Sequence, residues 1–452
     1  MRSRRGFLKD VAYTGGAAIT VPLEALWRNT VSGDALGFED YGALHGAIDE
    51  TTGLPLLELP DGFRYVSFGW TGDPMASGTR TPGLHDGMAA FAAGGDLVAL
   101  IRNHELAAGP AFAPALAYDS GAAGGTTTLL FDTKAGRMVS SRASLSGTSR
   151  NCAGGPTPWN SWLTCEETTM GPGEPLPITE DHGYVFEVPV DGTPTRKPIK
   201  EMGRFVHEAV AVDPETGIVY ETEDQRRSGL YRFIPDTRGR LANGGRLQML
   251  GLAGRSRFDT RTGQRAGSRY AVRWIDIEHA TRAHHDAAAK DNAGVFTQGL
   301  EGGGAIFARL EGAWYGDGRV FVTATNGGDA STGQVWELNI REQELRLIFE
   351  SPGAHSLSMP DNLAVSPRGG LVICEDGSAN PCVHALSREG KVVRFARNSC
   401  VLNGERNGFA GDFRNREFCG ATFSPDGRWL FVNMQSPGIT FAITGPWERG
   451  IL

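Results

Sequence analysis

The strongest constraint on the fold of this chain is a short pattern that recurs along it. An apolar run, a turn containing Asp-Pro, Ser-Pro or Asp-Thr with a nearby glycine, and a second apolar run follow one another at residues 129–139, 210–220, 363–374 and 421–432. Two apolar runs joined by such a turn are typical of a β-hairpin. Hairpins that recur along a long chain predict repeated antiparallel sheets, and this repetition favours a β-propeller.

Other segments support an all-β fold with loop and short helical insertions. Further strands are expected at residues 183–190, 229–234, 319–324, 333–338 and 391–395. The most helix-like stretch is 274–290, which we interpret as an insertion over one face, with His279, His284 and His285 as solvated loop residues. With 62 Gly, 24 Pro and 21% charged residues among 452, the composition is that of a turn-dense globular protein. We expect residues 31–452 to form a single propeller domain.

The chain is acidic, with a formal net charge of −8. This balance argues against a nucleic-acid partner, because such a partner is held mainly by basic contacts to phosphate, and it suits bound cations. Neither His-Glu-x-x-His nor Cys-x-x-Cys occurs in the sequence, so a structural zinc site finds no support.

Residues 1–30 resemble a twin-arginine export signal. Arg4 and Arg5 precede Phe7, Leu8 and Lys9, and a mild Gly/Ala-rich apolar stretch follows. We therefore expect a periplasmic or extracellular protein that meets the twin-arginine export machinery. No later stretch approaches the ~20 apolar residues that a membrane helix needs, so the mature chain should have no stable membrane span.

The six cysteines have several possible roles. In an exported protein they can form disulfides, and Cys374 and Cys382 are close enough in sequence to pair. Cys152 is different, because it lies in a Gly/Pro-rich turn and an apolar run joins it to Glu166 and Glu167. A thiolate and carboxylates brought together by one hairpin can form a mixed-ligand metal site. Taken alone, the segment favours the alternative of a buried free cysteine, and Cys165 is expected to be a buried strand residue.

Carboxylates lie at the ends of many of the expected strands or in the turns that adjoin them. The candidates are Glu105, Glu208, Asp224, Glu301, Glu311 and Asp361. In a propeller the inner strands converge on a central channel, where clustered acids repel one another unless cations are present. For the set as a whole, a site with several metal ions is favoured over separate surface acids.

An ordered series of motifs between about residues 60 and 440 resembles the PhoX-type alkaline phosphatase family. The motifs are Asn103-His104-Glu105, Asn151-Cys152-Ala153, Thr157-Pro158-Trp159, Leu163-Thr164-Cys165-Glu166-Glu167, Gly203-Arg204-Phe205 with His207-Glu208, Arg309 with Glu311-Gly312, Gly333-Gln334, Pro360-Asp361-Asn362-Leu363 and Ser424-Pro425-Asp426-Gly427 with Gln435. The chain departs from the family's pattern at Asn160, Val206 and Ser436, so details of the substrate pocket are expected to differ.

The resemblance implies a six-bladed propeller that binds Fe³⁺ and Ca²⁺ and hydrolyses phosphate monoesters, with a metal-bound oxide or hydroxide attacking phosphorus. It implies that Cys152 is an iron ligand, that Arg309 holds the phosphate and that Glu311 takes part in catalysis as a metal ligand. The remaining implied metal ligands are Glu105, Glu166, Glu208, Asp224, Glu301, Asp361 and Asn362. Glu167 is placed just outside this set, and a monomer acting on small phosphorylated substrates is expected.

Two alternatives from other classes stay open at the level of sequence. A propeller lactonase also binds calcium through acidic and amide side chains, and Asp361 with Asn362 suits it equally well. In that case Cys152 and Arg309 have no role. The second alternative is a non-catalytic exported propeller in which calcium serves rigidity.

Overall fold

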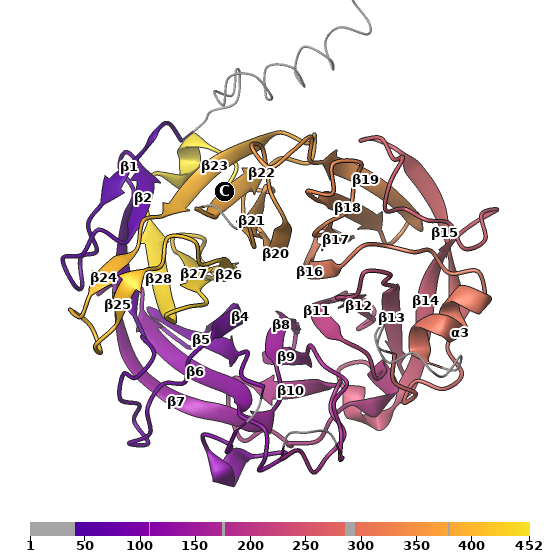
Figure 1. The fold of residues 1–452 in the computed structure, drawn as a ribbon, viewed down its shortest axis with the longest axis horizontal. Helices are drawn as coiled ribbons and strands as arrows, with labels where there is room; N and C mark the ends of the chain where they lie inside the picture. The colour runs from indigo at the N-terminus through magenta and orange to yellow at the C-terminus, as the bar shows by residue number, and fades with distance from the viewer. Residues whose placement is uncertain (1–40, 108, 174–176, 285–293, 378–379) are drawn as a thin grey trace, which may run out of the picture.

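The computed structural model describes residues 41–107, 109–173, 177–284, 294–377 and 380–452. Within these ranges the chain forms 28 strands but only one α-helix, α3 (Val295–Glu301). Short 3₁₀ helices lie at η1 (Pro114–Leu116), η2 (Lys200–Met202), η3 (Leu241–Asn243) and η4 (Trp447–Arg449). Figure 1 shows the strands arranged as sheets around a common axis, so the predicted all-β, propeller-like architecture is confirmed.

Most sheets follow the order of the chain. The first contains β4 (His85–Ala92), β5 (Leu97–His104), β6 (Gly124–Asp132) and β7 (Arg137–Thr148), and the second contains β8 (Asn151–Pro156), β9 (Ser161–Glu166) and β10 (Val185–Pro189). A nine-stranded sheet runs through β11 (His207–Val212), β12 (Val219–Glu223), β13 (Leu230–Pro235), β14 (Gly245–Leu252), β15 (Arg269–Asp276), β19 (Glu344–Glu350), β18 (Gln334–Asn339), β17 (Arg319–Ala324) and β16 (Leu310–Gly316).

The remaining sheets join both ends of the described chain. A six-stranded sheet contains β20 (Pro360–Val365), β21 (Leu371–Glu375), β22 (Cys382–Leu386), β23 (Val392–Asn398), β2 (Leu57–Pro60) and β1 (Leu44–Ala47). A four-stranded sheet contains β26 (Phe418–Phe423), β27 (Leu430–Met434), β28 (Ile439–Thr444) and β3 (Arg64–Phe68), and β24 (Val401–Asn403) pairs with β25 (Ala410–Asp412). Because β3 pairs with β28, with Ser67 opposite Phe441, an early strand closes the last sheet.

The strands nearest the axis form a closed ring. In order they are β4, β8, β11, β16, β20 and β26; each packs against the next, and β26 packs against β4 (Figure 1). The nine-stranded sheet supplies two of them, β11 and β16. The inner strand β11, with the sequence HEAVAV, is buried along its whole length, and its last four residues are apolar.

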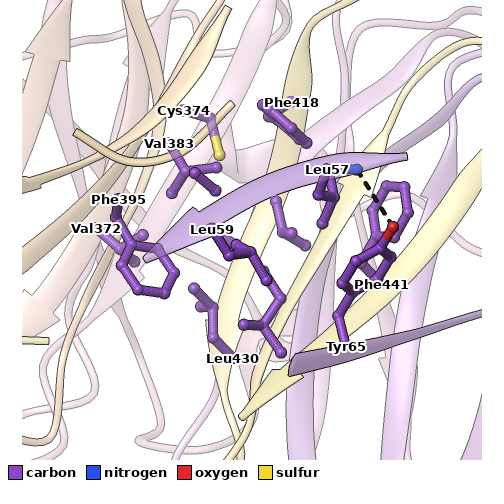
Figure 2. Close-up of a cluster of buried hydrophobic side chains, with 14 of the residues drawn as sticks. Leu57, Leu59, Tyr65, Val372, Cys374, Val383, Phe395, Phe418, Leu430 and Phe441 are labelled. Carbon is purple, nitrogen blue, oxygen red and sulfur yellow. Dashed lines mark hydrogen bonds between the residues drawn. The ribbon is translucent and has the colours of Figure 1, made fainter. Parts of the chain in front are cut away.

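A large apolar cluster lies where the chain ends meet. Figure 2 shows Leu57 and Leu59 of β2 packed between side chains of the last two large sheets, among them Phe395 and Phe441. Both leucines are buried, and burying such a side chain contributes about 1.5–3 kcal/mol. The hydroxyl of Tyr65 accepts a hydrogen bond from the backbone N–H of Leu57 at 3.2 Å, so a polar backbone group in this cluster is also satisfied.

The four predicted hairpins are confirmed as β6–β7, β11–β12, β20–β21 and β26–β27. The prediction of a helix at 274–290 is wrong for the described residues, since 274–276 end β15 and 277–284 form turns and coil. Residues 285–290 lie outside the described residues. His284 is buried against Glu223, not solvated, because the segment folds back over β12. All six cysteines are free, and Cys374 cannot reach Cys382, because it pairs with Val383 and points into the apolar cluster.

The proposed export signal, residues 1–30, lies outside the described residues. In the part of the chain that the structure describes, no helix has both the length and the apolar character needed to span a membrane.

Candidate metal centre

Each strand of the inner ring is irregular near its beginning. Its pairing register shifts between His85/Met88, Asn151/Gly154, His207/Val210, Leu310/Ala313, Pro360/Leu363 and Cys419/Thr422. Such a β-bulge leaves residues unpaired and redirects a side chain. The first residues inside these six bulges are Asp86, Cys152, Glu208, Glu311, Asp361 and Gly420. Five ligand-type side chains therefore occupy equivalent positions on five strands of the ring.

These bulge residues bring their side chains together. Ligand atoms of Glu208, Glu311 and Asp361 lie within 4.8 Å of one another, and so do those of Cys152, Glu167 and Glu208. Sγ of Cys152 is 3.6 Å from Oδ2 of Asp86. Because the two groups share Glu208, they form one assembly, which we call the axial cluster: Asp86, Cys152, Glu167, Glu208, Glu311 and Asp361.

The sixth bulge carries glycine for a steric reason. Gly420 has a φ of +62°, and a Cβ on it would lie 2.5 Å from the backbone oxygen of Asp86. No larger side chain fits there without moving the backbone of β4. The axial cluster is therefore built from five strands of the ring, and β26 approaches β4 closely on the sixth side.

The carboxylates of the axial cluster have few hydrogen-bond donors among the described residues, as Glu208 shows most clearly. Glu208 is completely buried, and neither of its oxygens has a hydrogen-bond partner among the described residues. The pKa of Glu208 is raised well above its ordinary value, mainly by burial and next by the negative charge of Glu311. Burial, followed by the charge of Asp376, raises the pKa of Asp361 to about 8. Burial, followed by the Asp86 charge, likewise raises the pKa of the Cys152 thiol, so this centre disfavours negative charge unless a cation enters.

Two arginines stand at equivalent positions beside the cluster. Arg150 immediately precedes β8 and Arg309 immediately precedes β16, and both have left-handed backbone, with φ of +50° and +45°. Arg309 holds Asp224 through two bonds, Nε–Oδ1 at 2.8 Å and Nη2–Oδ2 at 3.1 Å, and donates to Glu311 at 2.5 Å. Burial lowers the pKa of Arg309, but the carboxylates, Glu311 first, raise it more, so it stays charged.

Arg150 bridges two acids in the same manner. Its Nη2 lies 2.8 Å from Oε1 of Glu105 and also contacts Glu167. The second oxygen of Glu105 accepts a hydrogen bond from Nε2 of Gln435 at 2.8 Å. Both arginines thus place a planar guanidinium at the edge of the axial cluster, where it can meet an anion.

The predicted site residues fall into three groups. Cys152, Glu208, Glu311 and Asp361 lie in the axial cluster, and Glu105, Asp224 and Arg309 lie beside it.

The third group does not join them. Glu301 is exposed at the end of α3, and Oδ1 of Asn362 accepts the backbone N–H of Ala421 at 3.0 Å. Glu166 points elsewhere and accepts bonds from the N–H groups of Ser149, Gly183 and Tyr184 and from His182.

Sequence reasoning missed Asp86 and Arg150 and placed Glu167 too far out. Asp86 had a usable signal, because Asp86-Gly87 opens a strand as Glu311-Gly312 does. Both glycines permit close approach: a Cβ on Gly87 would lie 2.6 Å from Cα of Ala153, and one on Gly312 would lie 2.6 Å from the backbone oxygen of Asp361. A ligand-type residue followed by glycine near the start of an inner strand therefore marks this position in β4 and β16.

The profile of the alkaline phosphatase PhoX family matches residues 40–145 and 117–438. The chain belongs to that family. It is accordingly a phosphatase, which decides against the lactonase and non-catalytic alternatives. No curated protein sequence matches the chain.

Solved structures of similar fold include PhoX from Pseudomonas fluorescens in complex with vanadate, a transition state analogue. It is 17% identical, with a TM-score of 0.66, over 92% of this chain and 99% of the other. This likeness shows that PhoX and this chain share a fold. A gluconolactonase from Xanthomonas campestris is 12% identical over 90% of this chain and 98% of the other, with a TM-score of 0.42.

Proposed function

We propose that this phosphatase hydrolyses phosphate monoesters with Fe³⁺ and Ca²⁺ ions held by the axial cluster. The observation that carries the proposal is the convergence of five bulge residues from five inner strands on one assembly, with a guanidinium on either side. We further infer that the ring is a six-bladed propeller, with the nine-stranded sheet contributing two blades, and that residues 31–452 form one domain.

The donor chemistry fits these cations. The group of Glu208, Glu311 and Asp361 offers only carboxylate oxygens, which hard cations such as Ca²⁺ and Fe³⁺ prefer. The group of Cys152, Glu167 and Glu208 adds a thiolate, which suits a transition metal such as iron. The two unpartnered oxygens of Glu208 lie where both groups meet, so this side chain can serve both. Glu105 lies close enough to Arg150 and Glu167 to complete the set on that side.

When bound, such cations neutralise phosphoryl oxygens and lower the pKa of a coordinated water. Around them, Arg309 binds and orients the substrate. Its Nη1 makes no hydrogen bond with a described residue, whereas Nε and Nη2 are held by Asp224 and Glu311. Asp224 therefore fixes the guanidinium plane, and Glu311 keeps it at the cluster. The two N–H groups of Nη1 are therefore available to the oxygens of a phosphoryl group.

The remaining ligand predictions are narrowed by geometry. Glu166, Glu301 and Asn362 are left out of the proposed ligand set, because their oxygens are engaged elsewhere or lie away from the cluster. We retain the proposals that residues 1–30 direct twin-arginine export to the periplasm or beyond and that the mature protein is a monomer acting on small phosphorylated substrates.

The test is hydrolysis of a chromogenic phosphomonoester by the wild type, Cys152→Ala and Arg309→Ala, with metal analysis of protein purified by its export route. We expect iron and calcium in the wild type, loss of iron in Cys152→Ala, and a raised KM with unchanged metal content in Arg309→Ala. Calcium without iron in the active wild type, or equal rates in all three proteins, would contradict the proposal.

A further inference from the structure

A second group of potential ligands lies outside the axial cluster, on the hairpin of β21 and β22. Glu375 ends β21, and Cys382 and His384 lie on β22. One ligand atom from each lies within 4.8 Å of the other two. The register pairs Cys374 with Val383 and Ile373 with His384, so Cys382 is opposite Glu375 one step further along. Since side chains alternate along a strand, all three project from the same face.

The group is buried but incompletely bonded. His384 is buried, and its Nδ1 has no hydrogen-bond partner among the described residues. Its Nε2 is 3.0 Å from Oε1 of Glu375, yet too far off line to form a regular hydrogen bond. Sγ of Cys382 has only a weak contact, 3.6 Å from the backbone oxygen of Asn380. A buried imidazole whose Nδ1 has no hydrogen-bond partner, beside a free thiol, is costly unless a further group completes it.

The same sheet position elsewhere shows what is unusual here. Glu166 at the end of β9 and Glu223 at the end of β12 also accept backbone N–H bonds and pair with histidines, His182 and His284. Of these three Glu–His pairs, only the pair of Glu375 and His384 is grouped with a cysteine, Cys382, which lies two residues before His384. A purely structural Glu–His pair needs no thiol, so Cys382 is the feature that these other pairs do not explain.

The group also borders a pocket of about 290 Å³. Glu375 and Cys382 line it together with Arg394 and Arg397. Three protein ligands with one side facing a pocket leave a coordination position for water or a small anion, an arrangement found in open zinc sites.

We propose that Glu375, Cys382 and His384 bind a divalent transition metal such as Zn²⁺ or Co²⁺, separately from the axial cluster. The donor set of one carboxylate, one thiolate and one imidazole selects borderline cations over Ca²⁺. Binding requires loss of the protons on Cys382 and His384 to solvent, as is usual for such ligands.

The site is tested by titrating Co²⁺ into the protein as purified, in the Cys152→Ala variant, where the axial thiol is absent. We expect one equivalent of Co²⁺ to produce a near-ultraviolet thiolate band that is lost in Cys152→Ala/Cys382→Ser and in Cys152→Ala/His384→Gln. The matched control is Cys152→Ala/His182→Gln, which changes the equivalent histidine and should keep the band. Absence of the band in Cys152→Ala, or its survival without Cys382, would overturn the proposal.

A second measurement guards against misfolded variants. In the wild type, alkylation of Cys382, followed by mass spectrometry of its peptide, should slow at least tenfold with one equivalent of Zn²⁺, while Cys400 reacts at an unchanged rate. Equal rates for Cys382 with and without Zn²⁺ would also contradict the site. Neither readout depends on phosphatase activity, so failure of this site and failure of the proposed function are distinguishable.

Discussion

Glu166 and Glu208 are both completely buried glutamates on neighbouring sheets, yet their surroundings are opposite. Glu166 accepts hydrogen bonds from three backbone N–H groups and from Nδ1 of His182 at 2.6 Å. Glu208 accepts none from a described residue and faces other acids. A buried carboxylate with donors stabilises the native fold, whereas one without donors destabilises it until a cation binds. The bonding of an acid therefore indicates its role better than its burial does.

Glu221 limits this rule. It is buried on β12, its oxygens have no hydrogen-bond partner among the described residues, and Nδ1 of His207 lies 3.4 Å away. Among the described residues no second carboxylate is grouped with it, and burial alone raises its pKa. A metal centre thus requires convergence of several ligands as well as unsatisfied oxygens.

The largest effect is expected from changing the donor-free acid. Glu208→Gln should lower kcat/KM for a phosphomonoester by about 10³-fold, because a shared ligand of the centre is lost. Glu166→Gln should keep the specific activity of the folded enzyme within a few-fold. Steady-state assays with metal analysis of both variants check this prediction. Equal losses of kcat/KM in the two variants would contradict the functional difference between Glu166 and Glu208.

The next effect concerns stability and runs in the opposite direction. Glu166→Gln should lower the free energy of unfolding by about 3 kcal/mol, because an amide cannot accept all the donors that now meet a carboxylate. Glu208→Gln in chelator-treated protein should be neutral or stabilising, because it removes an unpaired buried acid. Urea denaturation of both variants, without metal, measures the difference. A strong destabilisation by Glu208→Gln would indicate that this residue is structural too.

The third prediction concerns substrate binding by Arg150 at the edge of the axial cluster. Arg150→Gln should raise KM about tenfold, since one of two guanidinium groups facing the site is removed, while kcat changes less. The matched control is Arg261→Gln, whose guanidinium pairs with Asp259 at the surface. An unchanged KM in Arg150→Gln would restrict substrate binding to Arg309.

The smallest effect is the pH dependence of the Glu166–His182 pair. Burial lowers the pKa of His182, but the Glu166 carboxylate more than offsets this, so the pKa is raised above its ordinary 6.5. The pair's contribution is therefore complete below pH 6.5 and is lost as pH rises through the raised pKa. The free energy of unfolding of the wild type should exceed that of His182→Gln by more at pH 6 than at pH 10, with a change on the order of 1 kcal/mol or less, measured by urea denaturation at the two pH values. A gap that widens with pH would give the wrong sign.

The sequence predicted local features well because they depend on nearby residues. The turn chemistry at 210–220 and 421–432 located hairpins β11–β12 and β26–β27. It did not locate α3, because the composition of 274–290 favoured a helix there, whereas the described residues 277–284 form turns and coil and α3 begins at Val295.

The axial cluster was harder to predict because a bulge shifts the alternation of side chains. Glu166 and Glu167 are adjacent, and nothing local tells which of them faces the axis. The register around β8 and β9 decides it: Glu166 is directed to His182 and Glu167 to Cys152. The ordered family motifs contain Glu208, Glu311 and Asp361, whose ligand atoms lie within 4.8 Å of one another in the structure, but Asp86 lies outside the motifs that carried the resemblance.

The pairing of β3 with β28 determines when the protein can be completed during its synthesis. The strand β3, which closes the last large sheet, leaves the ribosome early and must wait for β28, which is made near the other end of the chain. Until β26 arrives beside β4, the ring has a gap on the side of Asp86, and the acids of the axial cluster remain open to water. The complete axial cluster therefore forms only after nearly the whole chain has been translated, and a nascent chain that stops before β26 lacks one side of its enclosure.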